Sequence, residues 1–363
     1  MLSETTGDFL TLHEIVKEAR KKLSNNIWDY LIGGTETETT LKRNRMALDS
    51  LAFRPRALRD VSSIDCSGSL LGRKLRIPVA LAPIGSLESF EPGGGATAAK
   101  AAGEFNVFTI LSSVSQPGME AVAEAAAGPK IFQLYVRGDD AWVDDHVRRA
   151  IDSGYDAFCL TVDTAVYSRR ERDIAKRFVK PWRQRASGLE FQAGLNWNHV
   201  KRLKDKFDIP LVIKGLATGE DAALACEHGV EVVYVSNHGG RQLDHGRGAM
   251  DVLPEVVEAV AGRAEIVIDG GFSRGSDIVK AIALGANTVG IGRLVGYGMA
   301  AAGREGLVRV LELLEAEMFE CMGLLGVTDL GQLDRTYLHP AQPVVLPHVH
   351  SAFPLLNLDD QGY

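Results

Sequence analysis

Eight short apolar runs rich in β-branched residues constrain the fold of this chain more than any other feature. They are IPVALAP, VFTILSS, KIFQLYV, AFCLTVD, IPLVIKG, VEVVYVS, AEIVIDG and NTVGIGR, and they begin at residues 77, 107, 130, 157, 209, 230, 264 and 287. Segments with helical periodicity separate most of them. A strand followed by a helix, repeated eight times, predicts a parallel (β/α)8 TIM barrel of the α/β class over residues 76–325.

A doubly wound open sheet is the competing architecture. The stretch GIGRLVG, which begins at Gly290, resembles a dinucleotide-binding loop. Its spacing is G-x-G-x-x-x-G, however, and it follows the eighth predicted strand instead of the first. No acidic residue closes a following strand, as a ribose ligand would. These departures favour the barrel.

Three segments lie outside the repeating units. Residues 1–60 contain LHEIVKEARKKL, whose helical periodicity predicts an N-terminal helical extension over the bottom or side of the barrel. Residues 165–195 pass before the next predicted helix and carry eight Lys or Arg against three acidic residues. Such a connection is typical of a lid, with a solvated basic loop as the plain alternative. We expect the tail, residues 328–363, to form an extended segment that packs on a neighbouring subunit. We treat 1–363 as one domain.

Charge and composition exclude several classes of partner. The formal net charge is −7 and neither end carries a Lys/Arg cluster, so nucleic-acid binding lacks electrostatic support. The first residues lack the basic start and apolar run of a signal peptide, and no window holds eighteen uninterrupted apolar residues. We expect a soluble, cytoplasmic protein without membrane contact. His348 and His350 lack a nearby Cys or carboxylate cluster, so we interpret them as surface residues and expect no metal site.

Polar or ionisable residues end nearly every predicted strand. In a barrel of this kind the carboxyl ends of the strands meet on one face, where the active site lies. The glycine-rich ends DGGFSRG and GIGR follow the seventh and eighth strands, the usual phosphate position of the fold. We therefore expect a phosphate-bearing ligand there. The strand-end residues are Pro83, Gly85, Ser112, Gln133, Tyr135, Thr161, Asp163, Lys214, His238, Arg241, Asp269, Gly292 and Arg293.

The motif SNHGGRQLD, which begins at Ser236, carries a resemblance to a known family. Together with FQLYV, LTVD, RRERD, VIKG and IDGG, it resembles the FMN-dependent 2-hydroxy acid oxidases and dehydrogenases, which include glycolate oxidase, lactate oxidase and mandelate dehydrogenase. The resemblance runs from about residue 10 to 325. It implies a barrel that holds FMN at its mouth and oxidises an L-2-hydroxy acid to the 2-keto acid. It also implies a homo-oligomer, either a tetramer or an octamer.

The resemblance implies roles for six catalytic residues. His238 takes the hydroxyl proton while the α-hydrogen leaves as hydride to flavin N5, a task that suits an imidazole with a pKa near neutrality. Asp163 orients that imidazole. Arg170 and Arg241 clamp the substrate carboxylate with a bidentate geometry that Lys lacks. A register slip in SRRER would exchange Arg170 for Arg169. The tyrosines that complete the pocket are Tyr30 and Tyr135.

The resemblance also implies a flavin site. Lys214 lies beside flavin N1 and stabilises the anionic reduced ring, an electrostatic role for a charge placed in advance. Polar strand-end groups bond the ring, and the glycine-rich ends hold the phosphate. Besides Lys214, the expected flavin contacts are Pro83, Gly85, Ser112, Gln133, Thr161, Asp269, Gly270, Gly271, Ser273, Gly292 and Arg293.

Several positions depart from the family pattern. Ile84 stands where a Thr is usual, and EPGGG at residues 91–95 replaces H-P-E-G-E. Ser273 stands where many members carry Arg, so we expect the phosphate contact to shift by one residue to Arg274. Val114 replaces the Trp that narrows the pocket in short-chain glycolate oxidases. The space this frees predicts a bulky or aromatic 2-hydroxy acid of the mandelate or phenyllactate kind as the substrate.

Two other functions stay open. On the same flavin scaffold, the substrate would be an amine or a modified peptide with an oxidisable carbon next to a carboxylate or carbonyl. Alternatively, the barrel is catalytically silent and serves as a binding or scaffold protein, although the complete set of His, Asp, Arg and Lys argues against this. The electron acceptor, either oxygen or another compound such as a quinone or a protein, is also open.

Overall fold

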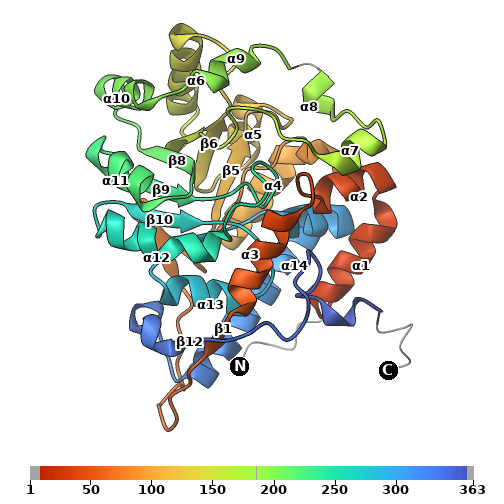
Figure 1. Cartoon of the computed structure of the whole chain (residues 1–363), viewed down its shortest axis with the longest axis vertical. Coiled ribbons are helices and arrows are strands. Elements are labelled where there is room, and N and C mark those ends of the chain that lie inside the picture. The colour runs from red at the N-terminus through yellow and green to blue at the C-terminus, as the bar shows by residue number, and fades with distance from the viewer. Residues whose placement is uncertain (1–8, 185, 358–363) are drawn as a thin grey trace.

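A closed barrel of eight parallel strands forms the centre of the molecule (Figure 1). The computed structural model describes residues 9–184 and 186–357. Each barrel strand pairs with the next along the chain, and β11 closes the ring on β4. All eight predicted strands are confirmed. They are β4 (Val79–Leu81), β5 (Phe108–Ser112), β6 (Lys130–Leu134), β7 (Ala157–Thr161), β8 (Leu211–Leu216), β9 (Val232–Val235), β10 (Glu265–Ile268) and β11 (Thr288–Ile291).

Helices alternate with these strands and cover the outside of the barrel (Figure 1). Strands covered on both faces have nearly continuous apolar sequences, and this is why the eight strands could be predicted from the sequence. The helix that begins at Gly219 is capped by Thr218, whose hydroxyl accepts a hydrogen bond from the Asp221 backbone N–H at 3.2 Å. The surrounding helices are α4 (Gly94–Phe105), α5 (Met119–Ala125), α6 (Asp140–Asp152), α10 (Trp197–Lys206), α11 (Gly219–Glu227), α12 (Ala249–Val260), α13 (Gly275–Ala283) and α14 (Arg293–Leu325).

A small hairpin closes one end of the barrel interior. Its strands are β2 (Gly68–Leu70) and β3 (Arg73–Leu75), which pair antiparallel. Leu70 and Leu75 are fully buried and pack with the inward-facing apolar side chains of the barrel. The Leu71 backbone N–H donates to Glu265, the first residue of β10, at 2.7 Å. The hairpin therefore fills the amino-terminal end of the barrel, opposite the mouth.

The predicted N-terminal helical extension is confirmed, and it consists of α1 (Leu12–Lys22), α2 (Asn25–Ile32) and α3 (Thr39–Asp49). Helix α1 packs along α14, so it covers the side of the barrel instead of the bottom. Helices α2 and α3 reach the mouth, where Tyr30 and Asn44 line the cavity described below. The extension thus contributes to the site as well as to the core.

Residues 165–195, here called the lid segment, contain three short helices that the sequence did not predict. They are α7 (Glu171–Ala175), α8 (Pro181–Gln184) and α9 (Leu189–Ala193), along the upper edge of Figure 1. Each is too short to show helical periodicity. Tyr167, Trp182 and Leu189 line the cavity at the barrel mouth. The plain alternative, a solvated loop, is therefore wrong for these positions.

The tail packs on its own chain, and the expectation of a purely extended segment is wrong. It contains the short helices η2 (Leu330–Gln332), η3 (Arg335–Tyr337) and η4 (Pro354–Asn357), and β12 (Leu338–Pro340) pairs antiparallel with β1 (Leu51–Phe53). The His350 ring stacks on Trp28 at 5.4 Å and its Nε2 lies 3.2 Å from the Tyr297 hydroxyl. His350 is therefore half-buried, whereas His348 is exposed as predicted.

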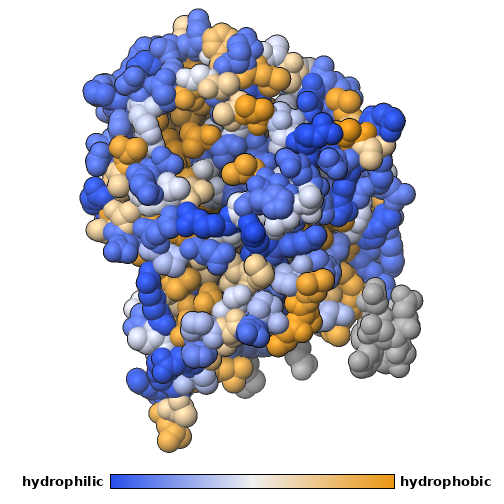
Figure 2. All heavy atoms as spheres, viewed as in Figure 1, coloured by the Kyte–Doolittle hydropathy of each residue, from blue (hydrophilic) through white to orange (hydrophobic). Residues whose placement is uncertain are grey.

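The molecular surface is largely hydrophilic on the face in Figure 2, with separate apolar patches. The tail contributes exposed apolar side chains, among them Val344 and Leu346, at 98% and 87% exposure. Within residues 9–184 and 186–357, no helix has the length and hydrophobicity needed to cross a bilayer.

Candidate active site

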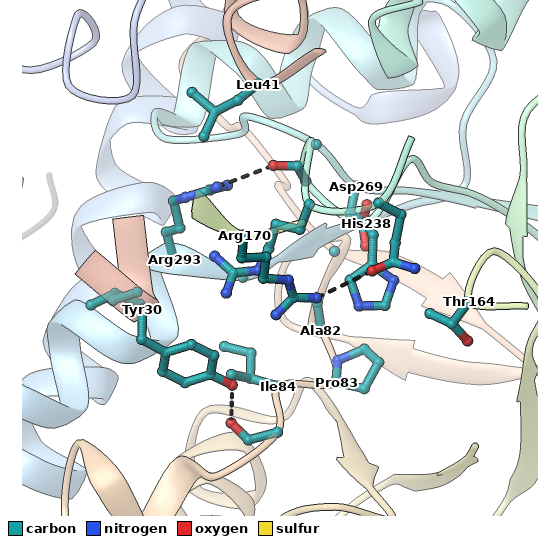
Figure 3. Close-up of a pocket in the computed structure, with 18 of the residues that line it drawn as sticks. Tyr30, Leu41, Ala82, Pro83, Ile84, Thr164, Arg170, His238, Asp269 and Arg293 are labelled. Carbon is teal, nitrogen blue, oxygen red and sulfur yellow. Dashed lines mark hydrogen bonds between the residues drawn. The ribbon is translucent and has the colours of Figure 1, made fainter. Parts of the chain in front are cut away.

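One cavity opens at the carboxyl ends of the barrel strands, and five of the six predicted catalytic residues, all but Asp163, line it (Figure 3). In that view Arg170, from the lid segment, lies between Tyr30 of α2 and His238, which follows β9. Segments far apart in the sequence thus converge on one space, as the barrel topology requires. The predicted site residues that line it are Tyr30, Pro83, Gly85, Tyr135, Arg170, Lys214, His238, Arg241, Asp269, Gly270, Gly271, Ser273, Gly292 and Arg293.

The structure places His238 between a carboxylate and a phenol. The His238 Nδ1 lies 2.9 Å from Asp163 Oδ1. An ionised carboxylate only accepts hydrogen bonds, so Nδ1 carries the proton and Nε2 is left free to accept one. The Tyr135 hydroxyl lies 3.2 Å from that Nε2. The arrangement leaves a basic nitrogen beside the cavity, the geometry that a general base needs.

The electrostatics keep His238 neutral and Asp163 ionised. Burial lowers the pKa of His238, Asp163 raises it, and Lys214 lowers it further, with a net fall below 6.5. Burial would raise the pKa of Asp163, but His238 and Lys214 outweigh that effect and its pKa is lowered. At neutral pH the imidazole is therefore ready to accept a proton, and a carboxylate stands behind it to stabilise the cation that results.

Arg170 and Arg241 face the cavity, and neither guanidinium group has an acidic partner among the described residues. Arg170 is 9% exposed, and its Nη2 donates to Gln242 Oε1 at 3.3 Å. Arg241 donates from Nη1 to the Gly33 carbonyl at 2.7 Å. Burial, Arg170 and Arg293 together lower the pKa of Arg241 to about 9. Crowded cations of this kind stabilise an incoming anion.

The register of the SRRER motif is resolved by the structure. Arg169 points to solvent, with 69% of its side chain exposed, and pairs with Glu171 at 3.7 Å. Arg170, the next residue, is buried and lines the cavity. The predicted register is therefore the one that the structure has.

Tyr30 closes the side of the cavity nearest α2. Its hydroxyl donates to the Gly85 carbonyl at 2.6 Å, as Figure 3 shows. The Arg241 guanidinium carbon lies 5.2 Å from the Tyr30 ring centroid. Burial raises the pKa of Tyr30 to about 12, so the phenol keeps its proton across the physiological range. Tyr30 thus acts as a neutral wall beside the arginines.

Lys214 is a buried cation at the carboxyl end of β8. Its Nζ contacts Ser236 Oγ at 2.9 Å and lies 3.5 Å from Asp269 Oδ2. Burial lowers the pKa of Lys214, but Asp269 and Asp163 outweigh burial and raise it above its ordinary value. The ammonium is therefore a permanent positive charge, which fits its predicted electrostatic role.

The glycine-rich strand ends form the part of the cavity where a phosphate is expected. Gly270 and Gly271 have positive φ values of 115° and 85°, which favour glycine. A Cβ on Gly292 would meet no protein atom within 4 Å, so this glycine leaves open space. Arg293 donates to three carbonyl oxygens, those of Ile32 at 3.3 Å, Gly33 at 3.0 Å and Gly239 at 3.1 Å. Its charge has no carboxylate partner among the described residues.

Buried polar groups without a partner support the predicted flavin. Both side-chain polar atoms of Gln133 and the Thr161 hydroxyl are buried and bond to no described residue. Such groups are rare in proteins unless a ligand or water completes them. They sit at the carboxyl ends of β6 and β7, beside the buried Ser112 at the end of β5, whose Oγ accepts from the Val114 N–H at 3.4 Å. With the glycines and Arg293, these residues fit FMN.

One expected contact is wrong. Arg274 does not take over from Ser273 at the phosphate end, because its Nη2 pairs with Glu317 at 2.6 Å and its Nη1 donates to the Ala352 carbonyl at 3.3 Å. Arg45, from α3, lines the cavity there instead and holds Asp277 with two hydrogen bonds of 2.7 and 2.8 Å. The carboxylate of Glu317 draws Arg274 away from the mouth.

Sequence reasoning missed several residues that line the cavity. Those that come from the helices before the barrel or from the lid segment carried no strand-end signal. Two others had a usable signal, because Gln242 directly follows Arg241 and Arg137 lies two residues beyond Tyr135. The missed residues that line the cavity include Leu41, Asn44, Arg45, Phe90, Arg137, Thr164, Tyr167, Trp182, Leu189, Gln242, and His348 from the tail.

The chain is similar to known flavin-dependent proteins in sequence and in fold. The FMN-dependent dehydrogenase family model matches residues 19–340. L-lactate oxidase of Nostoc sp. is 38% identical over 91% of this chain and 98% of its own length, and glycolate oxidase 1 of Oryza sativa subsp. indica is 39% identical over 92% and 96%. A crystal structure of mandelate oxidase with (S)-2-phenylpropionate has a TM-score of 0.86 and 37% identity, covering 93% of this chain and 100% of that chain. A mandelate oxidase mutant solved with an FMN adduct has a TM-score of 0.84.

Proposed function

This chain belongs to the FMN-dependent dehydrogenase family, and we propose that it oxidises a bulky or aromatic L-2-hydroxy acid to the 2-keto acid with His238 as the base. It is an FMN-dependent enzyme that oxidises 2-hydroxy acids, in line with its lactate, glycolate and mandelate oxidase relatives. The choice of substrate within that class and the roles of individual residues are the proposal.

The pairing of Arg170 and Arg241 in one cavity carries the proposal. Both guanidinium groups are free of acidic partners among the described residues, and burial together with the nearby cations Arg170 and Arg293 lowers the pKa of Arg241. A carboxylate bound between them relieves this repulsion and gains bidentate hydrogen bonds. A neutral amine or amide would gain far less, so the two arginines favour an acid as substrate.

The proton has a defined path in this site. With a carboxylate held by Arg170 and Arg241, the substrate hydroxyl is placed to bond His238 Nε2, which takes its proton. Asp163, 2.9 Å from Nδ1, stabilises the imidazolium, and Tyr135 offers a hydroxyl beside Nε2. FMN, when bound, supplies the acceptor for the hydride from the α-carbon. Lys214 holds a positive charge in the part of the cavity where the flavin ring is expected.

The wall beside Val114 supports a large apolar substrate side chain, although the space there is less open than predicted. A Cβ on Gly85 would lie 2.9 Å from Val114 Cγ2 and 3.6 Å from Trp182 Nε1. The indole of Trp182, from the lid segment, therefore lies beside the space left open by the small Val114 side chain. An aromatic substrate side chain gains a flat surface to pack against.

Larger-scale features of the proposal concern the whole chain. We propose that it acts as one FMN domain and assembles into a homo-oligomer. Exposed apolar side chains on the lid segment support assembly, because Val166 is 78% exposed and Val179 is 49% exposed. Light scattering on the FMN-loaded protein measures the assembly, and a monomer would contradict this part.

Anaerobic mixing of the FMN-loaded protein with 2-hydroxy acids tests the main proposal. Bleaching of the flavin absorbance by (S)-mandelate is expected, with a higher kcat/KM than for glycolate. Faster turnover of glycolate would overturn the substrate preference, and no bleaching by any 2-hydroxy acid would overturn the reaction. Hydrogen peroxide formed in air would assign oxygen as the acceptor, whereas turnover with an artificial dye alone would assign another acceptor.

A further inference from the structure

Arg137 is a cation of the cavity that the proposed reaction does not use. It lies two residues beyond Tyr135, past the carboxyl end of β6, and it lines the cavity while partly open to solvent. Its guanidinium carbon lies 5.8 Å from the Tyr135 ring centroid. The substrate clamp, in contrast, comes from the lid segment and from the loop after β9. Arg137 therefore offers a second positive centre on a different strand.

The charge of Arg137 is uncompensated among the described residues. Its Nη1 donates to the carbonyl of its neighbour Val136 at 3.1 Å, and no carboxylate lies within ion-pair distance. Arg45 and Arg172, which are also partly or wholly buried near the mouth, each bond carboxylates. Burial lowers the pKa of Arg137, and the only opposing influence is Tyr135. The guanidinium thus keeps its capacity to bind an anion.

The backbone around Arg137 is fixed by the lid segment. The Val136 backbone N–H donates to Gln192 Oε1 at 2.7 Å, and Gln192 Nε2 donates to the Thr161 carbonyl at 2.8 Å. A Cβ on Gly188, where φ is +67°, would lie 2.1 Å from the Arg137 carbonyl oxygen. These contacts fix the backbone position from which the Arg137 side chain reaches the cavity.

We propose that Arg137 is a second anion-binding subsite, and that the substrate is a 2-hydroxy acid whose side chain ends in a carboxylate. The inference rests on the proposed function: Arg170 and Arg241 hold the 2-carboxylate, and Arg137 receives the carboxylate at the far end. Val114 and Trp182, which line the same cavity, offer apolar surface to the part of the side chain in between. A charge-assisted bond to Arg137 selects a dianionic substrate over a neutral analogue of the same size.

Matched substrates isolate this contact. We compare 4-carboxymandelate with 4-carbamoylmandelate, and 2-hydroxyglutarate with its 5-amide, because each pair differs in charge and little in size. The wild-type enzyme is expected to prefer the acid of at least one pair. In Arg137→Met, kcat/KM for that acid should fall by roughly ten- to a hundredfold, while kcat/KM for the amide changes by less than about threefold. Arg137→Lys should restore part of the preference.

Arg169→Met is the control for net charge, since Arg169 lies near the mouth but faces solvent. It should leave the preference for the acid unchanged. Titration calorimetry with the 2-keto product of each compound gives a reading independent of turnover, and only the dianionic product should bind Arg137→Met more weakly than wild type. If Arg137→Met lowered kcat/KM equally for the acid and the amide, Arg137 would attract anions in general, and the proposed subsite would be overturned. Unchanged selectivity in both pairs would also overturn it, whereas failure of every 2-hydroxy acid, mandelate included, would instead reject the proposed function.

Discussion

His238 adopts a backbone conformation that few side chains tolerate. Its φ is 59°, and Gly239 and Gly240 follow with φ values of 64° and 75°. A Cβ on Gly240 would lie 2.4 Å from the Leu41 backbone nitrogen, so the loop packs tightly against α3. Strained residues of this kind persist where the surroundings hold them in place, often at functional sites. The HGG motif thus aims the imidazole into the cavity.

Removing the proposed base, His238, should stop the reaction without removing the flavin. His238→Ala is expected to bind FMN and keep its yellow colour, because the predicted flavin contacts lie elsewhere in the cavity. The rate of anaerobic flavin bleaching by substrate should fall by about 10²- to 10⁴-fold, the usual contribution of a general base. Stopped-flow absorbance measures this rate. Bleaching at the wild-type rate would show that another group takes the proton.

The pH dependence of kcat/KM should report the same residue. Since burial lowers the pKa of His238, the acid limb of the profile should have its midpoint below pH 6.5. Asp163 raises that pKa, so Asp163→Asn should move the limb to lower pH and also slow the reaction. A limb that moves to higher pH in Asp163→Asn would contradict the arrangement.

At the scale of elements, helix α8 of the lid segment brings Trp182 to the substrate wall. Replacing this indole with alanine opens the space beside Val114 and Gly85. We expect Trp182→Ala to raise kcat/KM for a naphthyl-substituted 2-hydroxy acid relative to mandelate by about tenfold, in the range that a change in pocket size supplies. Steady-state kinetics with both substrates measures the ratio.

A second tryptophan provides the control for this prediction. Trp197 stacks on His228 at 5.3 Å and does not line the cavity. Trp197→Ala should therefore leave the ratio of the two substrates unchanged. An equal change in both variants would mean that stability, and not the substrate wall, is responsible.

Helices α3 and α13 are tied together by a buried ion pair. Arg45 and Asp277 are 5% and 1% exposed and share two hydrogen bonds. Arg45→Met leaves the Asp277 carboxylate buried without its partner, so the free energy of unfolding should fall by about 3–5 kcal/mol. The exposed pair of Arg304 and Glu104 serves for comparison, and Arg304→Met should cost only about 0–1 kcal/mol. Urea unfolding with saturating FMN measures the free energy of unfolding of both variants. A similar decrease in the two would contradict the importance of burial.

The sequence predicts the parts of this molecule whose pattern repeats. The eight strands carried continuous apolar runs, and their polar ends had to meet on one face, so the positions of His238 and Lys214 followed from topology. The contribution of Trp182 did not follow, because α8 has four residues and no periodicity of its own. The orientation of Arg274 was also beyond prediction, since it depends on Glu317 in a helix distant in sequence. Long-range side-chain pairing leaves no local signal.

At the scale of the whole molecule, the tail is held by a titratable ring. Burial, followed by His348, Arg293 and Arg172, lowers the pKa of His350 from 6.5 to about 4. A pKa that is lower in the folded state contributes stability above pH 6.5, and this stability is lost as the pH falls toward 4. The docking of residues 341–357 should therefore weaken over this range.

Hydrogen exchange, corrected for the intrinsic effect of pH, measures this weakening. Amides of the tail should lose protection between pH 6.5 and 4, while those of barrel strands such as β7 should not. His350→Phe keeps an aromatic ring against Trp28 and removes the titration, so the tail of this variant should stay docked. An identical pH dependence in wild type and variant would rule out His350 as the cause.

The β2–β3 hairpin determines the route by which small molecules enter and leave the cavity. Because Leu70 and Leu75 fill the amino-terminal end of the barrel, small molecules reach the reaction chamber from the mouth. The hydroxy acid, its keto product and the oxidant then use the same entrance to the cavity. With a single entrance, bound substrate or product can obstruct access of the oxidant to the flavin.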